Sequence, residues 1–163
     1  GIILDLRGNP GGLLGATVDA TSEFLEDGVI LYEVDSQGNR KKWETRKGGL
    51  ATDLPMVILI NSGSASGSEV LAGALQDHGR APLIGMQTFG KGSVNILRRL
   101  SDGSGLYITT ARWQTPNGNL IEGEGLKPDF EVIATPEDRR LGNDPQLEKG
   151  VEYLLKQLPN PSK

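Results

Sequence analysis

A short apolar run at residues 55–60, "PMVILI", constrains the fold more than any other feature of this sequence. Six consecutive residues without a polar side chain are typical of a strand that is buried on both faces of a sheet. An Ala/Leu-rich stretch at 70–79, "VLAGALQDHG", and a second apolar run at 81–86, "APLIGM", follow it. A helix between two buried strands predicts a βαβ unit with a right-handed crossover. We therefore expect a parallel sheet at the centre of the fold.

The other segments predict further strands and helices around this unit. Residues 1–8 predict a buried strand, residues 13–25 a helix, residues 28–35 and 40–48 two strands around the turn "SQGN", residues 93–115 a hairpin that turns at "SDGSG", and residues 135–158 a final helix before a frayed end, "PNPSK". Together they predict an α/β fold with a mixed sheet and flanking helices.

The composition excludes several classes of function. The 163 residues fit one domain, and a formal net charge of −4 argues against nucleic acid as the main partner, because phosphate binding needs clustered Lys and Arg. The absence of cysteine excludes disulfides and thiolate metal sites, and a single histidine excludes a multi-histidine zinc site. No apolar run reaches the length of a transmembrane helix.

A serine-rich loop follows the first buried run. Residues 61–69, "NSGSASGSE", contain four serines between a strand and a helix. A strand-to-helix turn favours an exposed nucleophile, because the N–H groups of the helix can stabilise a developing oxyanion. Ser66 and Glu69 also match a capping box, in which Ser66 would simply cap the helix. The spacing leaves both roles of Ser66 open.

Lys91 lies in a glycine-rich segment at 85–93, "GMQTFGKGS", that nearly matches a phosphate-binding loop. Such a loop requires a Ser or Thr directly after the lysine and a helix directly after that residue. Position 92 is glycine, and the residues from 93 onward favour a strand. A nucleotide site is therefore the weaker interpretation, while a solvated turn and a chemical role for Lys91 stay open.

Lys91 is also a candidate base for a serine hydroxyl. The single histidine, His78, lies at the far end of the helix that begins near Ser66, about 18 Å away along the helix axis. A lysine can serve instead if burial or nearby positive charge lowers its pKa from the ordinary value of about 10.4. Because Lys91 follows a buried strand, we expect a desolvated amine near Ser66, at the carboxyl ends of adjacent parallel strands.

Four segments together resemble the carboxyl-terminal processing (tail-specific) serine peptidases. They are residues 1–12, "GIILDLRGNPGG", and residues 61–95, 100–118 and 121–132, in the order found in that family. The resemblance implies a ClpP/crotonase-like α/β core. It also implies a serine endopeptidase that cleaves protein substrates near their carboxyl terminus and requires no metal or cofactor.

The resemblance further implies roles for individual residues. Ser66 falls at the position of the nucleophile and Lys91 at the position of the general base. Asn95 stands where the family usually has a glutamine that orients the lysine, and its side chain is one methylene shorter. The backbone donors of the oxyanion hole fall at Gly67, where the family commonly has alanine, and at Gly11 or Gly12 of the "NPGG" turn.

The family also has a PDZ-like domain that recognises the carboxyl terminus of the substrate, and no segment here matches it. The first residues already predict a core strand, so we expect a chain that starts inside a domain. We expect residues 1–134 to form the protease core and residues 135–163 a C-terminal helical tail. In isolation, this core is expected to fold but to be weakly active.

Two further expectations come from the resemblance alone. Related peptidases act outside the cytoplasm, which implies an exported protein in the periplasm, in the thylakoid lumen or associated with a membrane. Its partners would be protein or peptide substrates and the PDZ domain of the full-length protein. Retinoid-binding proteins are similar to this family, so a non-catalytic binding module on the same fold is the alternative function.

Overall fold

The computed structural model describes residues 1–157, so the predicted frayed end at 159–163 lies outside the described residues. The elements in chain order are β1 (Ile2–Asp5), α1 (Leu14–Ser22), β2 (Val29–Asp35), β3 (Arg40–Glu44), β4 (Met56–Ile60), α2 (Gly67–Asp77), β5 (Leu83–Gly85), β6 (Ser93–Arg99), β7 (Gly105–Gln114), β8 (Phe130–Glu131), α3 (Pro136–Leu141) and α4 (Pro145–Gln157).

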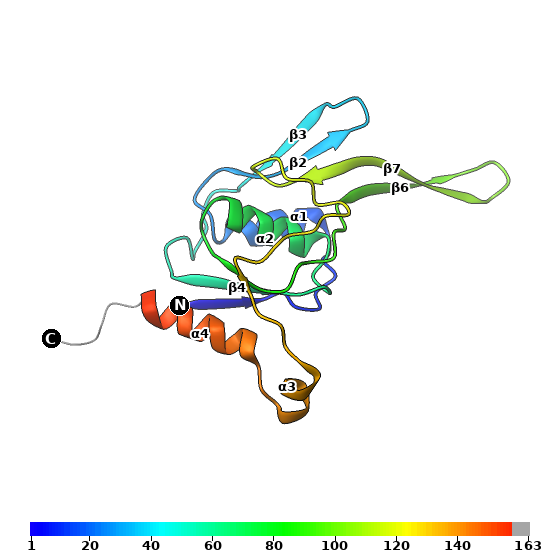
Figure 1. Ribbon diagram of the computed structural model, residues 1–163. Coiled ribbons are helices and arrows are strands. Elements are labelled where there is room, and N and C mark those ends of the chain that lie inside the picture. Colours follow the sequence, from blue (N-terminus) through cyan, green and yellow to red (C-terminus); the bar gives the residue numbers. More distant parts are fainter. Residues whose placement is uncertain (158–163) are drawn as a thin grey trace.

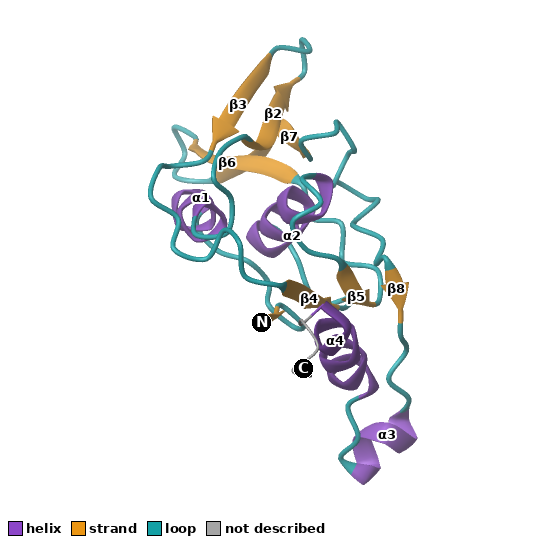
Figure 2. Cartoon of the chain, turned by 90° about the vertical axis from the view of Figure 1, so that its left-hand side faces the viewer, coloured by secondary structure: helices purple, strands orange, loops and turns teal. Residues whose placement is uncertain are grey.

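The elements form four layers, which Figures 1 and 2 show from two directions. An antiparallel sheet lies above the helices α1 and α2, and a parallel sheet lies below them. The helix α4 covers the outer face of the parallel sheet. The predicted α/β class with both kinds of strand pairing is confirmed. The parallel and antiparallel pairs belong to two separate sheets.

The parallel sheet has the strand order β1-β4-β5-β8. The strands β1 and β5 both pair in parallel with β4, so the predicted βαβ unit of β4, α2 and β5 is present. All five residues of β4 are buried, as the apolar run predicts. The carboxyl ends of β1, β4 and β5 therefore lie side by side at one edge of the sheet, where the loops with Gly11, Ser66 and Lys91 begin.

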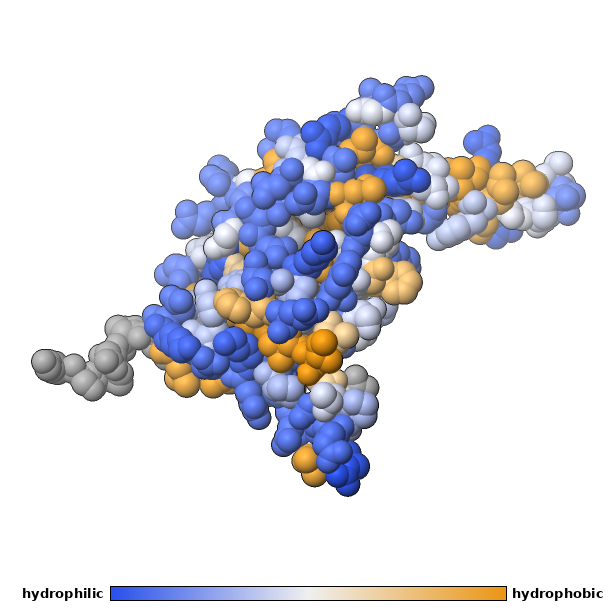
Figure 3. All heavy atoms as spheres, viewed as in Figure 1, coloured by the Kyte–Doolittle hydropathy of each residue, from blue (hydrophilic) through white to orange (hydrophobic). Residues whose placement is uncertain are grey.

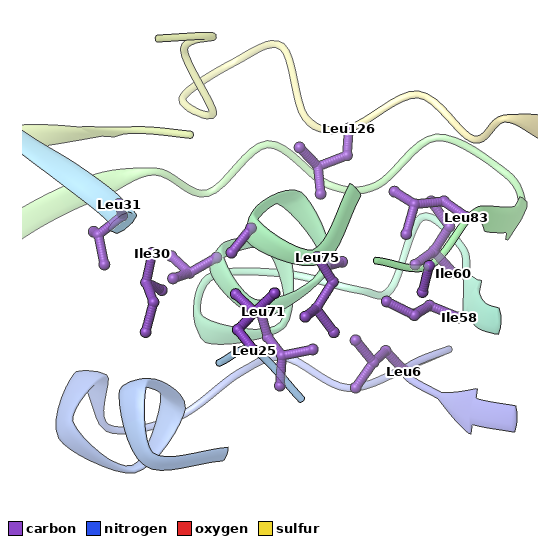
Figure 4. Packing of buried hydrophobic residues seen from close by; sticks show 14 of the residues in the cluster. Leu6, Leu25, Ile30, Leu31, Ile58, Ile60, Leu71, Leu75, Leu83 and Leu126 are labelled. Atoms are coloured by element: carbon purple, nitrogen blue, oxygen red, sulfur yellow. The ribbon is translucent and has the colours of Figure 1, made fainter. Parts of the chain in front are cut away.

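The main hydrophobic core surrounds the helices α1 and α2 and lies between the two sheets. Figure 4 shows Leu71 and Leu75 of α2 packed among Leu6, Ile58 and Ile60, which point toward the helices from the parallel sheet and its first loop. Alternate residues of β4, Val57 and Leu59, belong to a second cluster under α4. Because successive side chains of a strand point to opposite faces, one strand supplies both cores.

The hairpin of β6 and β7 projects from the body as an arm (Figure 1). Figure 3 shows apolar residues on this arm in orange. Its exposed large apolar side chains are Ile96, Leu97, Leu100, Leu106 and Tyr107. The strand β6 is also the edge strand of its sheet, whose order is β3-β2-β7-β6. Among the described strands, none pairs with the other side of β6.

The region expected to form one final helix contains two helices, α3 and α4. Residues 142–144 separate them, and Gly142 adopts a positive φ of 76°, a conformation that does not continue a right-handed helix. The division of the chain at residue 134 stays a prediction. In the region that the structure describes, no helix has the length and apolar character needed to cross a bilayer.

Candidate active site

Ser66 lies directly before α2, at the turn that follows β4. Its φ of 57° and ψ of −119° make it the one non-glycine residue with a positive φ among those described. Such a conformation costs about 1–3 kcal/mol and persists only where surrounding contacts hold it. Strained residues of this kind concentrate at functional sites, and this one is only partly buried. The strain singles out Ser66 among the four serines of the loop.

Ser64 and His78, the other polar residues considered from the sequence, have structural roles. The Ser64 hydroxyl is fully buried, donates to the carbonyl oxygen of Leu6 at 2.8 Å and accepts from the N–H of Asn61 at 3.0 Å. His78 lies at the C-cap of α2, where its Nε2 is 2.8 Å from the carbonyl oxygen of Val29. His78 is therefore at the far end of α2 from Ser66, as the sequence predicts.

Glu69 connects the loop of Ser66 with the loop of Lys91. Its side chain is fully buried, and its carboxylate accepts four hydrogen bonds. Oε2 accepts the backbone N–H of Ser66 and the backbone N–H of Lys91, both at 2.8 Å. Oε1 accepts the Thr88 hydroxyl at 2.5 Å and the N–H of Gly90 at 2.7 Å. The backbones at Ser66 and Lys91 therefore meet at one shared oxygen atom.

The environment of the Lys91 side chain differs from the expectation. The residue is exposed, not desolvated in a recess, in the loop between β5 and β6. Within residues 1–157, no carboxylate forms an ion pair with its ammonium group. Two carboxylates hold the backbone around Lys91. Glu69 accepts the N–H of Lys91, and Glu122 accepts the N–H of Gly92 at 2.7 Å.

Asn95, the expected orienting residue, is engaged by its own hairpin. Its Oδ1 accepts the Thr109 hydroxyl at 2.6 Å from the paired strand β7. Its Nδ2 donates to the Ser93 hydroxyl at 3.1 Å. The part of the chain that the structure describes gives no hydrogen bond between Asn95 and Lys91. The shorter side chain is thus held along the hairpin.

The "NPGG" turn packs against the first turn of α2. The N–H of Ala65 donates to the carbonyl oxygen of Asn9 at 3.0 Å. A Cβ on Gly11, which has a φ of 86°, would lie 2.5 Å from the backbone nitrogen of Gly67. A Cβ on Gly67 would lie 3.2 Å from the nitrogen of Gly12 and would also collide with the Thr17 hydroxyl, which explains glycine at position 67.

The N–H groups of this turn are not equivalent. The N–H of Gly11 donates to the Asn9 side chain at 2.9 Å. Among residues 1–157, the N–H groups of Gly12 and Gly67 have no hydrogen-bond partner. Beside them lies a hollow of about 200 Å³, lined mainly by small and apolar residues that include Leu13, Ala16 and Leu71. The two residues with unpartnered N–H groups therefore both line this hollow, and Gly67 directly follows Ser66.

The sequence interpretation missed Glu69 as part of the site. Its signal was the capping box, and the Glu69 half of that box is present, because the carboxylate accepts the Ser66 N–H. Nothing in the local pattern indicates that the same carboxylate also reaches residues 88–91. The Thr88 hydroxyl gave no signal, although it is buried and accepts the N–H of Leu126 at 2.7 Å.

Comparison with known proteins places this arrangement in a family. Residues 1–132 match the family described as Peptidase family S41. The chain belongs to peptidase family S41. Both candidate loops and the glycine turn lie within the matched residues, so the resemblance inferred from the four sequence segments is confirmed.

Several S41 relatives are carboxyl-terminal processing proteases. The chain is 49% identical to the carboxyl-terminal-processing protease of Synechocystis sp., over 83% of this chain and 31% of that protein. It is 44% identical to carboxyl-terminal-processing peptidase 3, chloroplastic, of Arabidopsis thaliana, over 79% of this chain and 25% of that protein. The chain therefore spans between a quarter and a third of the length of these relatives.

The solved structures agree with this assignment. The photosystem II D1 C-terminal processing protease superposes with a TM-score of 0.77 at 42% identity, covering 80% of this chain and 34% of that one. The structural neighbours of this chain are S41 proteases with the ClpP/crotonase-like fold. This likeness confirms the predicted fold class.

Proposed function

We propose that this S41 chain is the catalytic core of a serine endopeptidase in which Ser66 is the nucleophile and Lys91 the general base. The observation that carries the proposal is the shared hydrogen bond to Glu69 Oε2, which brings the backbones of both residues to one point. Family membership supports a peptidase, and the strained Ser66 supports the choice of nucleophile.

The chemistry follows from these two groups. As Ser66 Oγ bonds to the substrate carbonyl carbon, its proton passes to a neutral Lys91 Nζ, and the carbonyl π electrons move to the oxygen. The carbon–nitrogen bond then breaks, and the leaving amine takes the proton from Lys91. Water attacks the acyl-enzyme with Lys91 as base, and Ser66 recovers its proton when the ester bond breaks.

The unpartnered N–H groups of Gly12 and Gly67 are the donors proposed for the oxyanion. Gly11 is the weaker of the two expected donors of the turn, because Asn9 already accepts its N–H. Donors that are fixed before the reaction stabilise the developing charge without reorganisation. The hollow beside them would take a small apolar side chain of the substrate, next to the bond that is cleaved.

Because Lys91 is exposed, the substrate itself would have to exclude water from the Lys91 amine. An ammonium group in water stays protonated, and removing water favours the neutral amine. An extended substrate along the free edge of β6, which begins two residues after Lys91, would exclude water from the amine. Cleavage near the substrate carboxyl terminus is part of this proposal, in line with relatives that are carboxyl-terminal-processing proteases. A PDZ domain as partner and an exported location are further parts of it, which rest on the sequence resemblance alone.

The dyad is tested by two substitutions of Lys91. Lys91→Ala and Lys91→Arg should each lower the cleavage of an unstructured protein by at least about 100-fold, because alanine has no base and a guanidinium does not deprotonate in proteins. Cleavage is followed by gel electrophoresis, and circular dichroism checks that each variant is folded. Retained hydrolysis by either variant would exclude Lys91 as the base.

A non-catalytic binding module is the second candidate. The exposure of Lys91 and the engagement of the Asn95 amide by Thr109 favour it, since no residue within 1–157 then orients the amine. A fluorophosphonate probe separates the two functions. Labelling of the parent chain but not of Ser66→Ala supports the peptidase, and equal absence of labelling in both supports the binding module.

A further inference from the structure

Among the residues that the structure describes, Glu69 is the one buried acidic side chain, and the reaction described above gives it no role. It is 0% exposed, yet it extends from the first turn of α2 to the loop between β5 and β6. A buried carboxylate is costly unless its oxygen atoms are fully hydrogen-bonded. Here four donors surround two oxygen atoms, which matches the acceptor capacity of an ionised carboxylate.

The four donors come from both sides of the site. The Ser66 N–H belongs to the same helix terminus as Glu69. The other three belong to residues 88–91, which are about twenty positions further along the chain. The network continues, because the Thr88 hydroxyl that donates to Glu69 also accepts the N–H of Leu126. The carboxylate thus fixes two loops and a third segment behind them.

We propose that Glu69 is a positioning residue that sets the separation of Ser66 and Lys91 by holding both backbone amides on one oxygen atom. This inference rests on the proposed function. The restraint is direct, since each amide nitrogen lies 2.8 Å from Oε2. Reacting groups must be held close to their productive geometry, and a misplacement of 1 Å can lower the rate about 100-fold.

Two variants of Glu69 separate the effect of side-chain length from the effect of charge. In Glu69→Asp the carboxylate remains but is one methylene shorter, so it stays near the Ser66 N–H of its own helix and retreats from Lys91. In Glu69→Gln the length remains. Its amide oxygen can accept from Ser66 and Lys91, and its NH₂ group can donate to the Thr88 oxygen, while the Thr88 O–H and the Gly90 N–H lose their acceptor.

We therefore expect the charge-conserving variant to be the less active one. With an unstructured protein as substrate, kcat should fall about 100-fold in Glu69→Asp and less than about tenfold in Glu69→Gln, with KM nearly unchanged in both. Ile84→Val, a conservative change in the core under α4, is the control for a general loss of stability. It should keep the parent kcat.

Amide hydrogen exchange measured by NMR tests whether Glu69 holds the Ser66 and Lys91 amides, and it requires no hydrolysis. In Glu69→Asp the Lys91 amide should exchange at least about tenfold faster while the Ser66 amide keeps its protection. In Glu69→Gln both should stay protected and Gly90 should exchange faster. Unchanged exchange at Lys91 in Glu69→Asp would overturn the inference whatever the activity.

The outcomes distinguish this inference from the proposed function. If the parent hydrolyses and Lys91→Ala does not, but Glu69→Asp keeps the parent kcat or loses no more than Ile84→Val, the positioning role is wrong and the dyad stands. If the parent neither hydrolyses substrate nor reacts with the fluorophosphonate probe, the proposed function is wrong. The amide exchange rate of Lys91 in Glu69→Asp then still supports or refutes the role of Glu69 in holding the two loops together.

Discussion

The residues of this site are positioned mainly through their backbones. Ser66 adopts a positive φ, Gly12 and Gly67 present N–H groups, and Lys91 is fixed by its own N–H. A backbone group is placed by the packing of the chain around it, so the site depends on whether neighbouring backbones can approach closely. Glycine permits that approach at Gly11, where the turn lies against the start of α2.

Gly11→Ala should therefore damage both stability and activity. The residue has a φ of 86°, and a Cβ would lie 2.5 Å from the carbonyl oxygen of Ala65. We expect a loss of about 2–4 kcal/mol in the free energy of unfolding, from left-handed strain and overpacking, together with loss of hydrolysis. Urea unfolding and cleavage assays measure the two effects.

Gly15→Ala is the matched control for this substitution. Gly15 lies in α1, and nothing lies within 4 Å of the position its Cβ would take. Alanine is the better helix former, so a gain of about 0.5–1 kcal/mol with unchanged activity is expected. Equal effects of the two substitutions would contradict the close approach of the turn to α2.

At the scale of elements, α4 covers the outer face of the parallel sheet. Val57, Leu59 and Ile84 point away from the main core, and Leu154 of α4 covers them. Without this helix, one face of an all-parallel sheet would be exposed to water, although such sheets are normally covered on both faces. The helix lies beyond residue 132, where the family match ends, and it packs directly on the sheet that carries the site.

Two neighbouring leucines of α4 test this packing. Leu154 is 8% exposed and Leu155 is 63% exposed. Leu154→Ala should lower the free energy of unfolding by about 2–4 kcal/mol through the cavity that it leaves under the sheet. Leu155→Ala should change it by less than about 0.5 kcal/mol. Chemical denaturation of both variants measures the difference, and similar values would show that α4 does not pack as described.

At the scale of the whole molecule, Arg7 connects the first strand with the last helix. Its guanidinium binds both oxygen atoms of Asp5 and both oxygen atoms of Asp144, at distances of 2.7–2.9 Å. It also donates to the buried Gln146, which in turn donates to the carbonyl oxygen of Val132. The hydrogen bonds from Arg7 lower the pKa of Asp5 and of Asp144 below the ordinary value of 3.8.

This network predicts a specific pH dependence. Because both carboxyl pKa values are lower in the folded chain than in the unfolded chain, the stabilisation is complete above about pH 5 and is lost as the pH falls below 3.8. Arg7→Gln should cost about 2 kcal/mol at pH 7 and should flatten the loss of stability between pH 5 and pH 3. Acid unfolding followed by circular dichroism measures this slope.

Lys42→Gln provides the comparison for Arg7. Lys42 pairs with Glu44 at 2.8 Å, but both side chains are more than half exposed. Exposed ion pairs contribute little, so this variant should unfold in acid like the parent. A parent-like acid transition in Arg7→Gln as well would mean that the network does not link the two ends of the chain.

The sequence by itself determined which elements form and which residues could carry the chemistry. The apolar run at 55–60 gave a buried strand, and the segments around it gave the βαβ unit, because burial and periodicity act over a few neighbouring residues. The serine loop, the "NPGG" turn and Lys91 stood out by residue type and by resemblance. The pairing of parallel and antiparallel strands was likewise foreseen, though not its division between two sheets.

Only the tertiary structure decided how those residues meet. Local pattern gave Glu69 as a helix cap, but its contacts with Thr88, Gly90 and Lys91 join segments about twenty residues apart. Lys91 is exposed in the loop between β5 and β6, and the partner of Asn95 is set by the register of the β6–β7 hairpin, in which Asn95 lies opposite Thr109. Contacts between distant segments depend on the packing of whole elements, which no short stretch of sequence specifies.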